Sequence, residues 1–175
     1  MLKNSIMTKR NFILSLAAVL VASLSFAQEK ASPARVAEGV AGGSAITINY
    51  SSPAVKGRVI WGDLVPLGQI WRAGANEATR FTTEKDILIE GKRLPAGTYS
   101  FFIIPNEYQS TFVFNKVADQ WGAYNYDAEQ DQLRVNVYAG QGSNFEERLV
   151  YEVNEDGFEV RWEYGKASAK IQPAM

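Results

Sequence analysis

The side chains best suited to chemistry lie between Trp61 and Thr83, in the stretch WGDLVPLGQIWRAGANEATRFTT. This stretch combines bulky aromatic side chains, charged side chains and glycines, and it follows neither a strand nor a helix pattern. Loops of this kind on a β scaffold often carry binding or catalytic residues. We therefore predict a binding site here, with these candidate residues: Arg58, Trp61, Trp71, Arg72, Asn76, Glu77 and Arg80.

In this prediction each residue type has a role in binding an oxygen-rich ligand, neutral or anionic. Trp71 stacks on the ligand, Arg58 and Arg72 hold its negative or hydroxyl groups, and Asn76 and Glu77 orient it. A structural interpretation is also open, in which the tryptophans cap one end of the domain and Arg72 pairs with Glu77. The sequence does not separate these two interpretations.

The chain contains no histidine and no cysteine. Their absence excludes a Ser-His-Asp triad and the usual zinc and copper ligand sets. No glycine-rich nucleotide-binding motif is present either. We therefore expect no cofactor and no metal site, and we favour a protein that is not an enzyme.

Carboxylate chemistry remains open. Two acids about 5 to 10 Å apart can hydrolyse a glycosidic bond, so a glycan hydrolase that uses Glu77 with Asp63 or Asp131 is one alternative. Asp127, Glu129 and Asp131 alternate in a spacing that could bind calcium, but the glycine and the distal glutamate of an EF-hand are missing. We interpret these three residues as part of a solvated loop.

The first 27 residues have the pattern of a signal peptide. Basic residues precede an apolar run over 12–26, which is short for a membrane span, and small residues lead to Ala27. We expect cleavage after Ala27, a periplasmic or secreted protein, and no membrane span after cleavage. The leader removes only basic charge, so the mature chain is mildly acidic, which argues against a nucleic-acid partner.

Cleavage would leave about 150 residues, a length that suits one domain. Residues 28–44 are small and polar and are expected to form a flexible N-terminal lead. Residues 45–172 are expected to form a single β domain.

Period-two alternation of apolar and polar residues predicts strands through most of this domain. Phe158, Val160, Trp162 and Tyr164 are expected to share one face of a strand, and residues 99–104 are apolar on both faces and predict a central strand covered on both sides. Nine or ten short strands with turn signals between them favour an all-β fold, a single-domain antiparallel β-sandwich or a jelly-roll-like arrangement.

Three segments carry a family resemblance: SSPAVKGRVIWGDLVPLGQIWRAGANEATRFTT, IEGKRLPAGTYSFFIIP and WGAYNYDAEQDQLRVNV. Together they resemble the domain of unknown function (DUF) 2911 family of exported bacterial proteins, over about residues 45–171. The resemblance implies an all-β protein that is secreted or periplasmic, and it assigns no catalytic residue.

From these observations we expect a periplasmic binding module for a small polar ligand or a glycan, with its site in the 58–80 loop. The alternative is a structural or interaction domain that docks onto another envelope protein, for which an exposed strand edge offers a simple route.

Overall fold

The computed structural model describes residues 31–174, and most of them lie in strands. A short 3₁₀ turn, η1 (Ala128–Gln130), is the only helical turn in this described range. The predicted all-β fold is confirmed. The nine strands in the described residues are β1 (Ala34–Ala41), β2 (Ser44–Ser51), β3 (Thr79–Thr83), β4 (Ile87–Ile89), β5 (Lys92–Leu94), β6 (Gly97–Ile104), β7 (Gln109–Asn115), β8 (Asp131–Asn154) and β9 (Gly157–Pro173).

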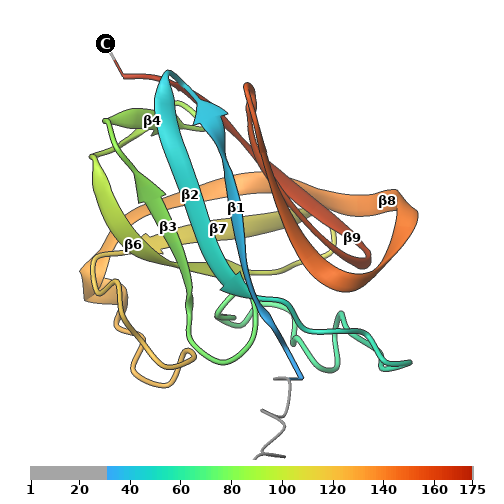
Figure 1. The fold of residues 1–175 in the computed structure, drawn as a ribbon. Coiled ribbons are helices and arrows are strands. Elements are labelled where there is room, and N and C mark those ends of the chain that lie inside the picture. Colours follow the sequence, from blue (N-terminus) through green and yellow to red (C-terminus); the bar gives the residue numbers. More distant parts are fainter. Residues whose placement is uncertain (1–30, 175) are drawn as a thin grey trace, which may run out of the picture. The chain divides into compact units, whose positions relative to one another are not determined.

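All nine strands belong to one antiparallel sheet, in the order β1-β2-β3-β6-β7-β8-β9-β4-β5 (Figure 1). The first strands pair mostly with their neighbours in sequence, whereas β4 and β5 join the far edge of the sheet through β9. Because continuous hydrogen bonding joins all nine strands, the finer description as a sandwich or jelly-roll is not confirmed and stays a prediction.

The predicted signal peptide, residues 1–27, lies outside the described residues. Between residues 31 and 174, no helix has the length and apolar character needed to cross a membrane.

We predicted that residues 28–44 form a flexible lead, and this is wrong for the part that β1 occupies. β1 pairs with β2 along its whole length. The sequence signal for this strand is weak. Its inward side chains are only Ala37 and Ala41, while Val36 and Val40 are exposed. A strand that buries small side chains and exposes large ones gives no apolar alternation of the usual kind.

The expectation that all strands are short is wrong for β8 and β9, which are 24 and 17 residues long. The register of their pairing shifts between Gln141 and Glu146 and again before Val150. Such bulges bend a long strand and increase its twist. The two strands can therefore extend well beyond the length that a flat sheet would allow.

The inward face of β9 changes in the middle of the strand. Phe158 and Trp162 are buried before this point, Ala167 and Ile171 after it, so burial switches from even to odd positions. Glu163 lies at the switch and has a φ of 55°, which inserts an irregular residue into the alternation. For this reason Tyr164, which we predicted to share the face of Trp162, is 48% exposed.

β6 has the predicted cover on both faces, and residues 99–103 are all buried. On one face Phe101 packs in the main core against Phe112, Phe114 and Phe158, with ring centroids 5.0 to 5.6 Å apart. On the other face Phe102 packs against Tyr126 from the 116–130 loop. The central strand thus joins two apolar clusters.

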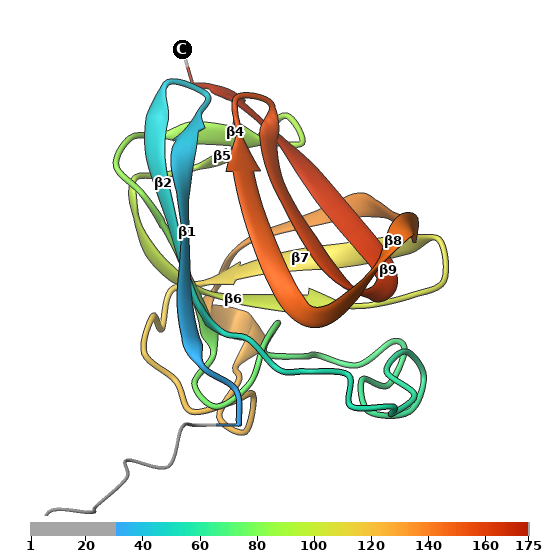
Figure 2. The ribbon, with the colours of Figure 1, turned by 45° about the vertical axis from the view of Figure 1, so that its right-hand side comes forward.

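The sheet curls so that its first strand lies beside its longest one, as Figure 2 shows. A Cβ atom placed on Gly39 of β1 would come within 2.8 Å of Cγ1 of Val153 in β8. A side chain at this position would therefore separate the two strands, and glycine allows the close approach.

The 52–78 loop leaves the end of β2 and extends below the β8–β9 hairpin in Figure 2, where it is teal to green. Backbone hydrogen bonds of 2.9 Å in both directions tie Trp71 to Ile103 of β6. The carbonyl of Ala73 accepts hydrogen bonds from the hydroxyls of Tyr151, at 2.7 Å, and Thr79, at 2.9 Å. These contacts fix the loop against the sheet.

Candidate functional site

Three tryptophans from distant parts of the chain form one cluster. Trp71 stacks on Trp162, with ring centroids 5.9 Å apart and an interplanar angle of 14°. Trp61 meets both rings edge to face, at 5.8 Å from Trp71 and 6.2 Å from Trp162. Aromatic pairs in these geometries contribute more than their buried area alone. The cluster therefore attaches the 52–78 loop to β9 and holds the indole of Trp61 in place.

Trp61 lines one wall of a pocket of about 590 Å³. The other walls come from the turn between β6 and β7, residues 105–108, from residues 138–141 of β8 and from residues 162–167 of β9. Leu67 adds a second contact from the 52–78 loop. Pockets for small ligands commonly have volumes of about 300–1,000 Å³, so this one has the size of a binding site.

The mouth of the pocket carries exposed aromatic side chains. Tyr108 and Tyr138 are each 76% exposed, and Tyr164 is 48% exposed and contacts Phe145 edge to face at 5.2 Å. Large side chains at such positions leave apolar surface in contact with water. A set of them around a cavity is typical of a surface that receives a ligand.

Two glycines in the pocket wall allow the aromatic rings to lie directly on the backbone. A Cβ atom on Gly165 would lie 2.4 Å from Nε1 of Trp61, and one on Gly140 would lie 2.9 Å from the hydroxyl oxygen of Tyr138. Glycine in a strand often marks a close approach of this kind. The shape of the pocket thus depends on the missing side chains at 140 and 165.

The charged groups that line the pocket are Glu107, Glu163 and Lys166. Lys166 forms an ion pair with Glu159 on the neighbouring part of β9, and Glu159 also bonds Arg161. Burial alone would raise the pKa of the Glu159 carboxyl, but the hydrogen bonds from Lys166 and Arg161 outweigh it and lower the pKa. The charge of Lys166 is therefore matched by a carboxylate outside the pocket.

Of the seven residues that we predicted from the sequence, Trp61 lines this pocket, and Trp71 packs directly behind it. Arg58 lies in a turn of the same loop, where its guanidinium donates to the carbonyls of Val55, at 3.0 Å, and Ala54, at 2.5 Å. Its hydrogen bonds therefore stabilise the turn.

Asn76 anchors the loop to the start of the domain. It has a φ of 60°, a conformation that asparagine tolerates better than most residues, and its Nδ2 donates to Ser51 Oγ at 3.1 Å and to the Ser32 carbonyl at 3.3 Å. This is the local bonding expected under the structural interpretation of the loop.

Arg72, Glu77 and Arg80 lie at the second loop, residues 116–130. The guanidinium of Arg72 is close to Gly122, and its buried Nε has no hydrogen-bond partner among the described residues. Arg80 pairs with Asp119 at 2.9 Å, and Glu77 is exposed and bridges to Trp121 through the backbone. In the described part of the chain Arg72 and Glu77 do not form an ion pair with each other.

The carboxylates of the second loop have structural contacts. Asp131 accepts hydrogen bonds from Asn115, at 2.9 Å, and from Tyr126 and Arg134, each at 2.6 Å. Burial, together with the hydrogen bond to Asp131, raises the pKa of Tyr126 to about 12. Asp127 caps the η1 turn through the amide of Glu129. From residue 31 to residue 174, no three acidic side chains gather closely enough to hold a metal ion.

Sequence reasoning missed most of the residues around the pocket. One signal was available for Tyr138, since a tyrosine among the polar positions of an alternating strand points its ring to solvent. The side chains that the structure adds to Trp61 are Tyr108, Tyr138, Trp162, Glu163, Tyr164 and Lys166.

Comparison with known proteins gives one family. A family model described as "protein of unknown function (DUF2911)" matches residues 32–171, which confirms the resemblance of the three sequence segments. The comparison with curated proteins and the comparison with solved structures gave no match.

Proposed function

The chain belongs to the DUF2911 family, and we propose that its β domain is a binding module that takes a small polar ligand or a segment of a glycan in the pocket beside Trp61. The observation that carries this proposal is the combination of a cavity of about 590 Å³ with exposed tyrosines at its mouth. We place the module outside the cytoplasm, in line with the signal peptide that the sequence predicts.

The chemistry of the pocket supports a ligand with both apolar and polar faces. Trp61 and Tyr138 offer flat surfaces on which a sugar ring or another planar or saturated ring can lie. Asn106, Ser110 and Gln141 supply hydrogen-bonding groups in the same lining. A few polar groups within a mainly aromatic wall fix the orientation of a ligand, while the wall supplies contact area.

A thermal-shift screen of the purified protein tests the proposal. The panel holds envelope sugars, peptidoglycan fragments, organic acids, small phosphates and quaternary ammonium compounds. A compound present at about 100 times its dissociation constant stabilises the folded state by about 2.7 kcal/mol, which is readily visible. We expect at least one class to raise the melting temperature, and Gly165→Ala to remove the shift because the new Cβ displaces Trp61. Shifts that persist in this variant would place the site elsewhere.

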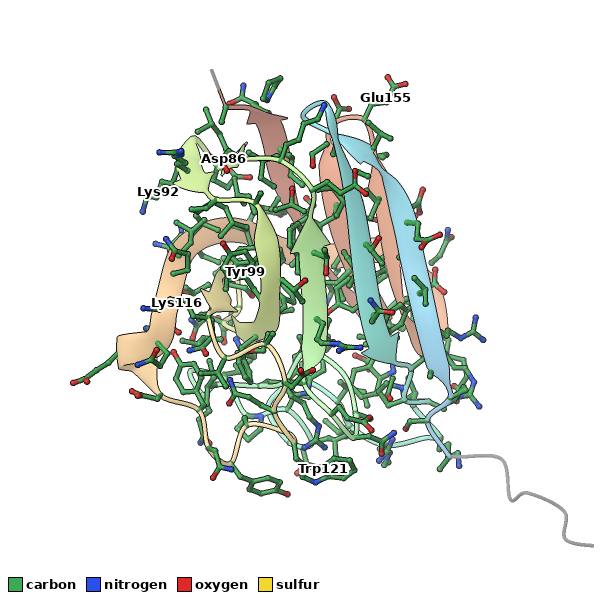
Figure 3. The ribbon with its side chains drawn as sticks, turned by 60° about the vertical axis from the view of Figure 1, so that its left-hand side comes forward. Asp86, Lys92, Tyr99, Lys116, Trp121 and Glu155 are labelled. Atoms are coloured by element: carbon green, nitrogen blue, oxygen red, sulfur yellow. The ribbon has the colours of Figure 1, made fainter. Side chains whose placement is uncertain are left out.

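A second candidate function is docking onto an envelope protein through the 116–130 loop. Trp121, labelled in Figure 3, is 60% exposed, and Tyr124 is 80% exposed. Both residue types are enriched in protein interfaces. The test is capture from an envelope extract with the wild type and with a Trp121→Ala, Tyr124→Ala double variant. A protein enriched by the wild type and lost with the variant would support docking, and equal enrichment by both would contradict it.

A further inference from the structure

The pocket carries more negative charge than its contacts neutralise. No ion pair involves Glu107 or Glu163 in the part of the chain that the structure describes. Lys166, the one cation of the lining, is paired with Glu159. The carboxylates of Glu107 and Glu163 are therefore the two charges of the lining without a partner.

The register of the sheet adds to this imbalance. Glu163 of β9 lies directly opposite Glu146 of β8, and like charges at facing positions destabilise a sheet. Arg161 offsets part of the repulsion, because it bonds Glu146 at 3.3 Å and also pairs with Glu152 and Glu159. Glu163 has none of these ion pairs, although its Cα partner in the ladder is another glutamate.

The backbone at Glu163 is also unusual. Its φ of 55° is uncommon for a residue other than glycine, asparagine or aspartate, and such residues concentrate at ligand-binding sites. Bulges beside functional sites often redirect a side chain, and this one lies between Trp162 and Tyr164 in the pocket wall. The positive φ thus places an acidic residue in the pocket wall, between two aromatic residues of the lining.

The aromatic side chains point to the same chemistry. Trp61, Tyr108, Tyr138 and Tyr164 all line the pocket. The faces of tryptophan and tyrosine rings attract ammonium groups, and sets of such rings bind methylated ammonium ions. Aromatic faces beside two unpaired carboxylates disfavour an anion and favour a cation.

We infer that the ligand of this pocket carries a positively charged nitrogen, held between the aromatic rings and the carboxylates of Glu107 and Glu163. The inference rests on the proposed binding function and specifies its ligand class. A quaternary ammonium headgroup and the amine of an amino sugar share this chemistry.

Isothermal titration calorimetry with matched pairs of compounds tests the inference. The first pair is choline and its uncharged isostere 3,3-dimethylbutan-1-ol, and the second is glucosamine and glucose, at about pH 6, where a simple amine is protonated. We expect at least one charged compound to bind about tenfold more tightly than its uncharged partner. The pair that shows the difference identifies the source of the nitrogen.

Carboxylate variants locate the effect. Glu163→Gln should weaken binding of the charged compound several-fold and leave the neutral compound unchanged. Glu155→Gln is the matched control, because Glu155 lies in the turn between β8 and β9, outside the pocket lining. Figure 3 shows Glu155 at the end of the domain opposite to Trp121.

The outcomes distinguish a failure of the cationic-ligand inference from a failure of the proposed binding function. If charged and neutral partners bound equally well and Gly165→Ala abolished their binding, the pocket would still be a binding site. The inference that its ligand carries a positive charge would then be wrong. Tighter binding of acetate or glucuronate than of choline and glucosamine would have the same consequence. If Gly165→Ala removed the binding of no compound in these pairs or in the wider panel, both the proposed binding function and the inference would be contradicted.

Discussion

The indole of Trp61 lies directly on the backbone of Gly165, so closely that a Cβ atom at this glycine would come within 2.4 Å of the indole nitrogen. Trp61 comes from the 52–78 loop and Gly165 from β9, and the contact sets the distance between these two walls of the pocket. The indole nitrogen also points to the Trp162 carbonyl at 3.4 Å. Because the atom closest to the indole belongs to strand backbone, a side chain at Gly165 would fit only if the indole moved away.

Gly165→Ala should therefore change the pocket and cost stability. The φ of Gly165 is not positive, so alanine fits the backbone, and the cost comes from displacing Trp61. Such overpacking destabilises a domain by about 1–3 kcal/mol. Urea denaturation followed by tryptophan fluorescence measures it. Gly142→Ala is the control, because its new Cβ would meet no atom closer than 3.8 Å, and an equal loss in both variants would contradict the role of the Trp61 contact.

The tryptophans of the chain should differ sharply in their contribution to stability. Trp162 is 1% exposed and contacts two other indoles, so Trp162→Ala should lower the free energy of unfolding by about 3–5 kcal/mol. Trp121 is 60% exposed, and Trp121→Ala should change it by less than about 0.5 kcal/mol. Chemical denaturation of both variants gives the comparison. A large loss in Trp121→Ala would show that the 116–130 loop depends on this side chain.

The fold was predictable where side chains alternate strongly and was not where the backbone departs from regularity. The alternation from Phe158 to Trp162 predicted the first half of β9 correctly. The bulge at Glu163 was not predictable, because glutamate gives no signal of a positive φ, and so Tyr164 was assigned to the wrong face. β1 was missed because its buried side chains are alanines.

The candidate site was predictable only in part for a related reason. Trp61 stands out within an irregular, aromatic segment, and the structure brings it to the pocket. The other walls are residues 105–108, 138–141 and 162–167, which lie far apart in the sequence. Their proximity depends on strand order and register, which local patterns do not specify.

Tyr126 should make the domain sensitive to alkaline pH. Its pKa is raised to about 12 in the folded state, whereas the unfolded chain loses the phenolic proton near pH 10. The folded state therefore binds more protons between these values, and stability falls as the pH rises through this range. Tyr126→Phe should make the fall shallower, measured as the free energy of unfolding at several values from about pH 8 to pH 11. An unchanged slope would contradict the role of Tyr126.

Glu159→Gln should weaken the binding of choline. The substitution removes the carboxylate that pairs with Lys166, so an unmatched ammonium group is left in the lining of the pocket. We expect choline to bind several-fold more weakly and acetate more tightly than in the wild type, both measured by calorimetry. Glu152→Gln removes another partner of Arg161 without touching Lys166, and it should leave both affinities unchanged. An equal loss of choline affinity in the two variants would contradict a direct effect of Lys166.

Amide and indole N–H signals in a nitrogen-15 correlation spectrum test most directly whether the pocket beside Trp61 is the binding site. Choline and glucosamine are titrated into the labelled protein in separate experiments. We predict that the indole signal of Trp61 and the amides of residues 138–141 and 162–167 shift, while the indole signal of Trp121 stays in place. Shifts confined to Trp121 and the region of Arg72 would contradict the assignment of the pocket, and no shift with either compound would contradict a cationic ligand.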